Sequence, residues 1–245
     1  DALVQEGFDG FERGASAPAV QAASMTQYRD DIDIPVAFPP IDLSGIFPEL
    51  VSAAGLRQER IAETEKYAHV TYFFSGGREA PYDGETRTLV QSPRVATYDL
   101  APQMSAREVT DAILSSLGKG ETDVYIVNFA NADMVGHTGI YEAALKAVET
   151  VDGCLKEIVP AVLARGGTVA ITADHGNSEQ LWDASTDQPH TAHTLNKVPF
   201  VLIGDGVRGA RMREHGVLAD VAPTLLEIMG VEKHPLMDGT SLVLG

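Results

Sequence analysis

The sequence has a single cysteine, Cys154, among its 245 residues. One thiol excludes an internal disulfide, and so sparse a use of cysteine is typical of proteins from a reducing compartment. Cys154 lies in a stretch whose apolar residues have helical spacing. We therefore expect it to pack as a small apolar side chain and not to act as a nucleophile.

Long apolar runs are also missing. No segment approaches the ~20 consecutive apolar residues that a membrane-spanning helix requires, and the first residues lack the basic and then apolar pattern of a secretory signal. We therefore expect a soluble protein of the cytoplasm that has no membrane partner.

Basic residues are scarce relative to acidic ones. The sequence has 18 Lys and Arg against 35 Asp and Glu, which gives a formal net charge of −17. This balance argues against nucleic acid or an anionic membrane as a partner, because both attract basic surfaces. A small anion is still compatible with it, since bound divalent cations neutralise the carboxylates of an acidic site.

Segments with strand and helix spacing alternate over most of the chain, and 44% of the residues are hydrophobic, enough for the core of one large domain. The stretch 36–40, Val-Ala-Phe-Pro-Pro, is typical of an extended linker, because each proline disfavours helix at the residue before it, and we place a domain boundary there. Beyond it we expect strands at 58–63, 69–74, 124–129, 169–174 and 198–203, and helices at 47–54, 105–118, 140–164 and 218–229. This order predicts an α/β fold with a largely parallel sheet covered by helices on both faces.

Two local signals set the ends of the helix expected at 105–118. Ser105 and Glu108 have the spacing of a capping box at the first turn, and Gly118 provides a stop signal at the last. A polar excursion at 79–87 and an edge strand precede this helix.

The stretch 169–177 is a short apolar strand that ends in Asp174 and His175. In open α/β sheets, ligands bind beyond the carboxyl ends of the strands, so two potential metal ligands lie in a favourable position. The alternative explanation is an Asp-His-Gly turn without chemistry.

Further Asp and His residues accompany two other expected strands. Asp133 and His137 follow the strand at 124–129, and His193 precedes the strand at 198–203. A mixture of carboxylate and imidazole favours Mn²⁺ or Zn²⁺ over Mg²⁺ or Ca²⁺. Together with Asp174 and His175 these residues exceed what one ion normally uses, and they indicate a pair of ions of the kind that serves phosphoryl chemistry.

Each candidate also has a simpler explanation. Asp133 fits a turn or capping residue, His137 a loop imidazole, and His175 an imidazole bonded to a backbone carbonyl. His190 is a rival to His193 in the same loop. The remaining histidines lack an acidic neighbour in the sequence, so we expect ordinary surface or packing roles for His69, His215 and His234.

Three motifs carry the metal-ligand candidates: Asp133-Met-Val-Gly-His137, Thr172-Ala-Asp174-His175-Gly-Asn177 and Thr191-Ala-His193-Thr194. With Ala62-Glu-Thr-Glu-Lys66-Tyr67 and Phe73-Phe-Ser-Gly-Gly-Arg78, they resemble the motifs of the cofactor-independent (2,3-bisphosphoglycerate-independent) phosphoglycerate mutases, in the alkaline phosphatase superfamily. The Asp-His-Gly motif alone indicates only the superfamily. The motif that contains Lys66 and the motif from Phe73 to Arg78 narrow the resemblance to the mutases. The resemblance extends over nearly the whole chain.

This resemblance implies an alkaline-phosphatase-like fold, a three-layer α/β sandwich with a mostly parallel central sheet. It implies that Asp133, His137 and His193 hold one Mn²⁺ and that Asp174 and His175 contribute to a second, with Mg²⁺, Zn²⁺ or Co²⁺ as substitutes. Lys66 would bind the phosphoryl group of a phosphoglycerate. The implied activity is that of an isomerase of glycolysis and gluconeogenesis, which interconverts 3-phosphoglycerate and 2-phosphoglycerate through a phosphoserine.

The sequence departs from the family in one respect. In the family, the nucleophilic serine and an aspartate of the second metal site precede this region, and Ser75, Ser92, Ser105 and Ser178 fall in the wrong motifs. We expect residues 1–40 to be the remnant of an inserted substrate-binding (phosphotransferase) domain with a linker. Residues 41–245 would then be an incomplete metal-binding, phosphatase-like domain, and the chain would be the C-terminal half of a monomeric enzyme, inactive by itself.

Two other functions remain open at this point. A relative of the phosphatases, sulfatases or phosphopentomutases would carry a different nucleophile in the absent segment. A non-catalytic metal-binding module would carry none.

Overall fold

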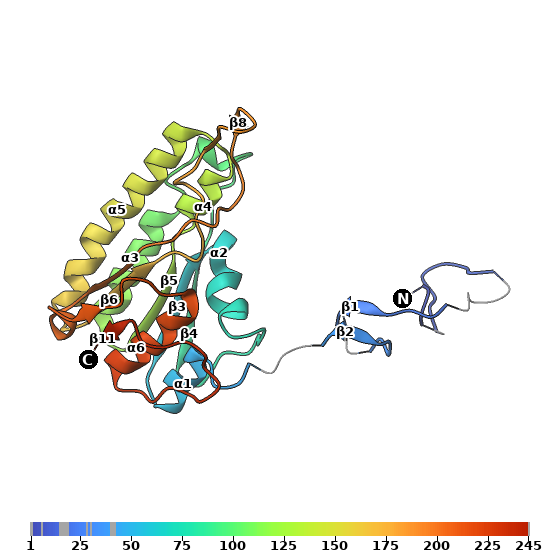
Figure 1. Cartoon of the computed structure of the whole chain (residues 1–245), viewed down its shortest axis with the longest axis horizontal. Helices are drawn as coiled ribbons and strands as arrows, with labels where there is room; N and C mark the ends of the chain where they lie inside the picture. The colour runs from blue at the N-terminus through green and yellow to red at the C-terminus, as the bar shows by residue number, and fades with distance from the viewer. Residues whose placement is uncertain are drawn as a thin grey trace. The chain divides into compact units, whose positions relative to one another are not determined.

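The computed structural model describes residues 2–5, 7–14, 20–27, 29, 31–39 and 43–244. It divides into two compact units, Asp1–Leu43 and Ser44–Gly245, close to the boundary expected near residue 40, although Pro40 itself lies outside the described residues. In the first unit, β1 (Ser24–Thr26) and β2 (Val36–Phe38) pair in parallel. The remaining helices and strands belong to the second unit (Figure 1).

The main sheet of the second unit has three parallel strands in the order β4-β3-β5. They are β3 (Gln58–Glu63), β4 (Glu85–Val90) and β5 (Val124–Asn128). The central strand β3 is buried along its whole length, because its neighbours flank it and helices lie above and below. The expected α/β class with a parallel main sheet is confirmed.

Helices cover both faces of this sheet (Figure 1). On one face, α3 (Ala106–Lys119) and α5 (Tyr141–Leu163) pack with Ile61 into a core that Tyr125 and Val127 of β5 also contact. On the other face, α1 (Phe47–Ala53) and α6 (Val221–Met229) form a core with Val124 and Ile126. Alternate residues of β5 thus serve opposite cores, which explains the continuous apolar run in its sequence.

The second pair of strands differs from the parallel arrangement. β6 (Val169–Thr172) pairs antiparallel with β9 (Phe200–Ile203). Within the part of the chain that the structure describes, β5 pairs only with β3 and β6 only with β9, so each has an edge without a strand partner. The loop expected after β6 contains a short hairpin, and the other short elements are β7 (Trp182–Asp183), β8 (Gln188–Pro189), β10 (Arg211–Met212), β11 (Val243–Leu244) and the turns η2 (Tyr98–Leu100), η3 (Asp205–Val207) and η4 (Leu218–Asp220).

The strand predicted at 69–74 is wrong. Residues Thr64–Ala68 form helix α2, which continues directly into a π-helical turn, η1 (His69–Phe73). The aromatic and β-branched composition suggested a strand, but Lys66, Val70 and Phe74 recur at helical spacing. Lys66 and Val70 are buried, and the Phe74 ring packs edge-on against Phe47. Burial of that one face therefore outweighs the strand propensity of the individual residues.

The predicted ends of the helix at 105–118 are also corrected. Ser105 precedes the first residue of α3, but its hydroxyl donates to the Gln91 carbonyl oxygen at 2.7 Å and does not cap the helix. Gly118 stays inside the helix, which ends at Gly120 with φ of 67°. A left-handed residue after the last turn is the usual role of such a glycine.

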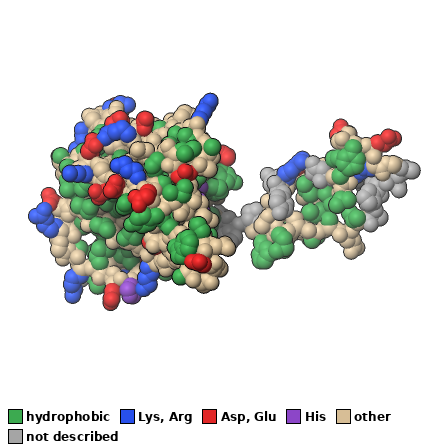
Figure 2. Space-filling view, turned by 90° about the horizontal axis from the view of Figure 1, so that it is seen from above, with side chains coloured by type: hydrophobic (Ala, Val, Ile, Leu, Met, Phe, Trp, Pro, Cys, Tyr) green, Lys and Arg blue, Asp and Glu red, His purple; other side chains and the backbone are tan. Residues whose placement is uncertain are grey.

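The expectations for Cys154 and for three further helices agree with the structure. Cys154 is buried in the core between α3 and α5, and helices begin and end close to the predicted residues at 47–54, 140–164 and 218–229. Acidic and basic side chains are interspersed on the face that Figure 2 shows. No helix among the described residues combines the length and apolarity needed to cross a membrane.

Candidate metal centre

Asp133 and His137 reach the site from one short helix. Strand β5 ends at Asn128, and α4 (Asn131–Gly136) begins three residues later, with His137 as its C-cap. Four residues apart, the two side chains lie on the same side of the helix. His137 Nε2 is 3.1 Å from Asp133 Oδ1.

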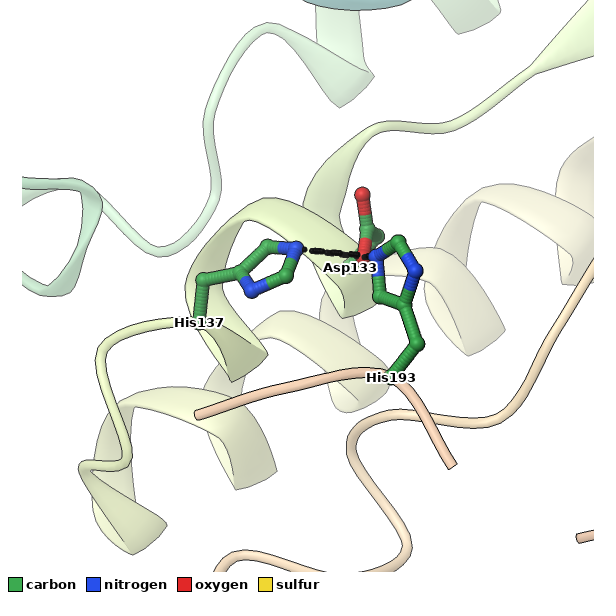
Figure 3. Close-up of side chains that lie close together, drawn as sticks. All are labelled: Asp133, His137 and His193. Atoms are coloured by element: carbon green, nitrogen blue, oxygen red, sulfur yellow. Dashed lines mark hydrogen bonds and ion pairs between the residues drawn. The ribbon is translucent and has the colours of Figure 1, made fainter. Parts of the chain in front are cut away.

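His193 completes a compact group of three potential metal ligands (Figure 3). Its Nε2 atom lies 3.2 Å from Asp133 Oδ1 and 3.1 Å from His137 Nε2, so the three atoms form a nearly equilateral triangle. Separations of this size fit ligands that each lie about 2.1 Å from one cation. The donor set, one carboxylate oxygen and two imidazole nitrogens, suits Mn²⁺ or Zn²⁺.

The protonation of His137 also fits a ligand role. Its Nδ1 atom lies 2.6 Å from the Thr191 carbonyl oxygen, which accepts hydrogen bonds and cannot donate them. Nδ1 therefore carries the proton, and in the neutral ring Nε2 keeps its lone pair for a cation. The side chains of His137 and His193 are 37% and 49% exposed, so one side of the group is open to solvent and to a substrate.

Asp133 is the most buried member and is held in place by two further residues. Lys66 Nζ forms an ion pair with Asp133 Oδ2, and the Asn177 amide donates to Asp133 Oδ1 at 2.9 Å. Burial raises the pKa of Asp133, but the hydrogen bonds from Lys66 and Asn177 and the charge of Lys66 outweigh it and lower the pKa below its usual value. The carboxylate is therefore ionised at neutral pH.

Asp174 and His175 lie beside this group but do not form a second group of three. His175 Nε2 is 3.6 Å from Asp174 Oδ2 and 4.0 Å from Asp133 Oδ1, and its ring stacks on His193 with centroids 3.6 Å apart. The Asp174 side chain is 54% exposed. Among the described residues, only Asp133, His137 and His193 form a cluster with metal-ligand spacing.

Residues to which the sequence interpretation gave no role also belong to the site. Asn177 is buried and joins Asp133 as described, and Glu179 bonds to the Asn177 backbone N–H at 2.7 Å. The polar residues after His175 in the sequence were the available signal for Asn177 and Glu179.

Comparison with known proteins adds to this geometry. A model of the metalloenzyme superfamily matches residues 14–233. The chain is 54% identical over 242 residues to the 2,3-bisphosphoglycerate-independent phosphoglycerate mutase of Pseudomonas fluorescens, and 55% identical over 244 residues to that of Acetivibrio thermocellus. Each match covers 99% of this chain and 47% of the relative. The chain thus spans about half the length of the curated relatives it matches.

A solved structure of a phosphoglycerate mutase is also similar to this chain. A phosphoglycerate mutase of Leishmania mexicana, studied at low cobalt concentration, superposes with a TM-score of 0.80 at 34% sequence identity. The match covers 99% of this chain and 47% of that one. The superfamily match and the ligand spacing of Asp133, His137 and His193 together support binding of a divalent metal.

Proposed function

Because the chain belongs to the metalloenzyme superfamily, we propose that it forms the metal-binding part of a phosphoglycerate mutase that interconverts 3-phosphoglycerate and 2-phosphoglycerate. The observation that carries this proposal is the triangle of Asp133, His137 and His193, with sides of 3.1 to 3.2 Å. It occurs in a chain that is 54% and 55% identical to two such mutases.

The proposed cofactor is a pair of Mn²⁺ ions. Asp133, His137 and His193 would hold one ion, and Asp174 and His175 would contribute to the other, together with residues that this chain does not supply. Bound divalent cations neutralise phosphoryl oxygens and lower the pKa of a hydroxyl nucleophile. The low pKa of Asp133 keeps its carboxylate ionised, and the Nδ1–H of His137 leaves Nε2 of the neutral ring free for the ion, as such binding requires.

Lys66 would bind the substrate phosphoryl group. Its side chain is only 7% exposed, and its ammonium already lies at Asp133 Oδ2 on the border of the ligand triangle. A compact cation in this position neutralises phosphoryl oxygens without the fixed geometry of a guanidinium.

The nucleophile would come from outside this chain. We propose that residues 1–40 belong to an inserted substrate-binding domain and that residues 41–245 form a phosphatase-like domain completed by a segment elsewhere in a longer, monomeric, cytoplasmic enzyme. Two observations support this: the chain spans about half the length of its relatives, and within the described residues β5 and β6 each have an edge without a strand partner.

A chimera tests the proposal. This chain would replace the matched region of the Pseudomonas fluorescens mutase, and conversion of 3-phosphoglycerate would be followed by phosphorus NMR with Mn²⁺ present. We expect conversion by the chimera and by its His215→Ala control, and none by His193→Ala or by this chain alone. A folded, Mn²⁺-loaded chimera without activity would contradict the proposed function, and conversion by this chain alone would contradict the missing nucleophile.

A further inference from the structure

Two loops that carry imidazoles of the site are joined to each other. The turn after β6 contains His175, Gly176 and Asn177, and the later loop contains His193 and Thr194. The Thr194 backbone N–H donates to the Gly176 carbonyl oxygen at 2.9 Å, which makes an isolated antiparallel bridge between the loops. Through this bridge the His175 and His193 rings are brought into their stacked arrangement, with an interplanar angle of 21°.

Glu179 reinforces the same junction with its carboxylate. One oxygen, Oε2, accepts a hydrogen bond from the Asn177 backbone N–H at 2.7 Å. The other, Oε1, accepts one from the Thr194 hydroxyl and one from the Asn196 amide, the latter at 2.9 Å. A single side chain therefore bonds to both loops at once.

The junction is too tight for any residue with a side chain at position 176. A Cβ atom on Gly176 would lie 2.2 Å from Thr194 Oγ1 and 2.4 Å from Glu179 Oε1. Backbone and carboxylate therefore approach each other closely here, as glycine alone permits.

Glu179 is well suited to a fixed acceptor role. The hydrogen bond from Thr194, with those from Asn196 and the backbone, lowers the pKa of Glu179 to about 2. It stays ionised at neutral pH and accepts from every donor around it. Glu179 does not belong to the group of Asp133, His137 and His193, which has metal-ligand spacing. Its hydrogen bonds are to residues of the two loops.

We propose that Glu179 is a positioning residue: it holds the loop of His193 against the turn of His175 and Asn177 and so sets the ligand triangle for a divalent cation. Two routes lead from it to the ligands. Thr194 follows His193 directly in the chain, and Asn177 donates to Asp133 Oδ1 at 2.9 Å. The inference rests on the proposed function only in requiring that the triangle binds a divalent cation.

The test compares Glu179→Gln with Asp183→Asn in the whole chain. Gln offers one acceptor oxygen to three donors, so at least one of the bonds is lost. Asp183 is a matched control, because its pKa is likewise lowered to about 2 by bonds to Ser185 and Thr186, residues of its own loop. Mn²⁺ affinity is measured from the electron paramagnetic resonance signal of free Mn²⁺, and thermal melting is measured without metal.

We expect Glu179→Gln to weaken Mn²⁺ binding about 10-fold, at the lower end of the 10- to 100-fold range for residues that orient metal ligands. Asp183→Asn should bind as the parent does. If Glu179→Gln lowers only the melting temperature and binds Mn²⁺ like the parent, the positioning role is wrong. If Glu179→Gln fails to fold, Thr194→Val takes its place with the same expected direction; it removes the hydroxyl that donates to Glu179 and accepts from the Asn196 backbone N–H.

Hydrogen exchange separates this inference from the proposed function. The Thr194 amide is bonded to Gly176, so in the metal-free chain Glu179→Gln should speed its exchange at least about 10-fold, and Asp183→Asn should leave it unchanged. If the parent chain does not bind Mn²⁺, the proposed metal site is wrong, and faster exchange at Thr194 still supports the loop junction. Unchanged exchange contradicts the junction whatever the metal does.

Discussion

Lys66 of α2 forms an ion pair with Asp133 of α4, 67 positions later in the chain. Both side chains are largely buried, with exposures of 7% and 14%. The carboxylate that serves the ligand triangle through Oδ1 is thus bound to a cation through Oδ2. Because Lys66 and a divalent ion would share one carboxylate, they repel each other, and the affinity for the ion depends on Lys66.

Lys66→Met should therefore strengthen Mn²⁺ binding, by at least about twofold, because it removes a positive charge next to the site and keeps the length of the side chain. The chimera that carries this substitution should lose activity, since the phosphoryl group loses its cation. Mn²⁺ titration followed by electron paramagnetic resonance measures the first effect. Lys146→Met, an exposed lysine of α5 paired with Glu149, is the control, and weaker binding by Lys66→Met would contradict the repulsion.

His193→Ala should weaken Mn²⁺ binding by about 100-fold or more, because the substitution removes the imidazole nitrogen that is one of the three ligands of the cation. His215→Ala provides the matched comparison: His215 is exposed and lies near Lys197 and Glu214, outside the ligand triangle. Isothermal titration calorimetry at neutral pH measures both affinities. Equal affinities for the two variants would place the cation elsewhere.

Local order in the sequence was enough to predict part of this site. Asp133 and His137 follow the apolar run of β5, and parallel strands end at one edge of a sheet, so their position could be inferred from the chain alone. The stacking of His175 on His193 and the bonds of Glu179 depend on how two irregular loops pack. No periodicity encodes that packing, so these contacts could not be predicted from the sequence.

The fold, too, could be predicted from the sequence only in part. The strand at 124–129 is predicted from its apolar run of β-branched and aromatic residues. The strand at 58–63 is found as expected, but its sequence, Gln-Glu-Arg-Ile-Ala-Glu, has only two apolar residues, and its complete burial is not evident from composition. The segment 69–74 was not predicted correctly, because aromatic and β-branched residues are compatible with a strand and with a buried helical turn. Tertiary burial of Val70 and Phe74 decided for the helix. The antiparallel pairing of β6 with β9 likewise depends on the path of the chain between the two strands, which composition does not reveal.

Glu63 should make the stability of the chain depend on pH. It is fully buried at the end of β3, and burial raises the pKa of its carboxyl group, although the Ser92 hydroxyl and the Ser105 backbone N–H donate to it at 2.9 and 3.3 Å. A raised folded-state pKa means that the stabilising contribution is present below the unfolded value, about 4.5, and is lost as the pH rises through the folded value.

Relative to Glu63→Gln, the parent should therefore gain melting temperature as the pH falls from 7 toward 4.5. Thermal melting of both proteins across this range measures the difference. Glu157 is an exposed residue of α5 that pairs with Arg107. Between Glu157→Gln and the parent, the difference in melting temperature should not grow in this way as the pH falls. A difference between the parent and Glu63→Gln that is independent of pH would contradict the raised pKa.

Two glycines in helices should respond in opposite ways to alanine. Gly136 lies in α4 between Asp133 and His137, and a Cβ atom there would lie 2.2 Å from Asn177 Oδ1. Asn177 is buried and bonds to Asp133, so it has little room to move away. Gly136→Ala should destabilise the chain by about 1–3 kcal/mol, as overpacking does, and should also weaken Mn²⁺ binding through the displaced Asn177.

Gly153 provides the comparison, since it lies inside α5 and a Cβ atom there would have no neighbour within 4 Å. Gly153→Ala should stabilise the chain by about 0.5–1 kcal/mol, because alanine loses less backbone entropy in a helix than glycine does, and should leave Mn²⁺ affinity unchanged. Urea denaturation measures both stabilities. If Gly136→Ala were stabilised like Gly153→Ala and bound Mn²⁺ like the parent, the close contact between α4 and Asn177 would not exist in solution, and Asn177 would not orient Asp133.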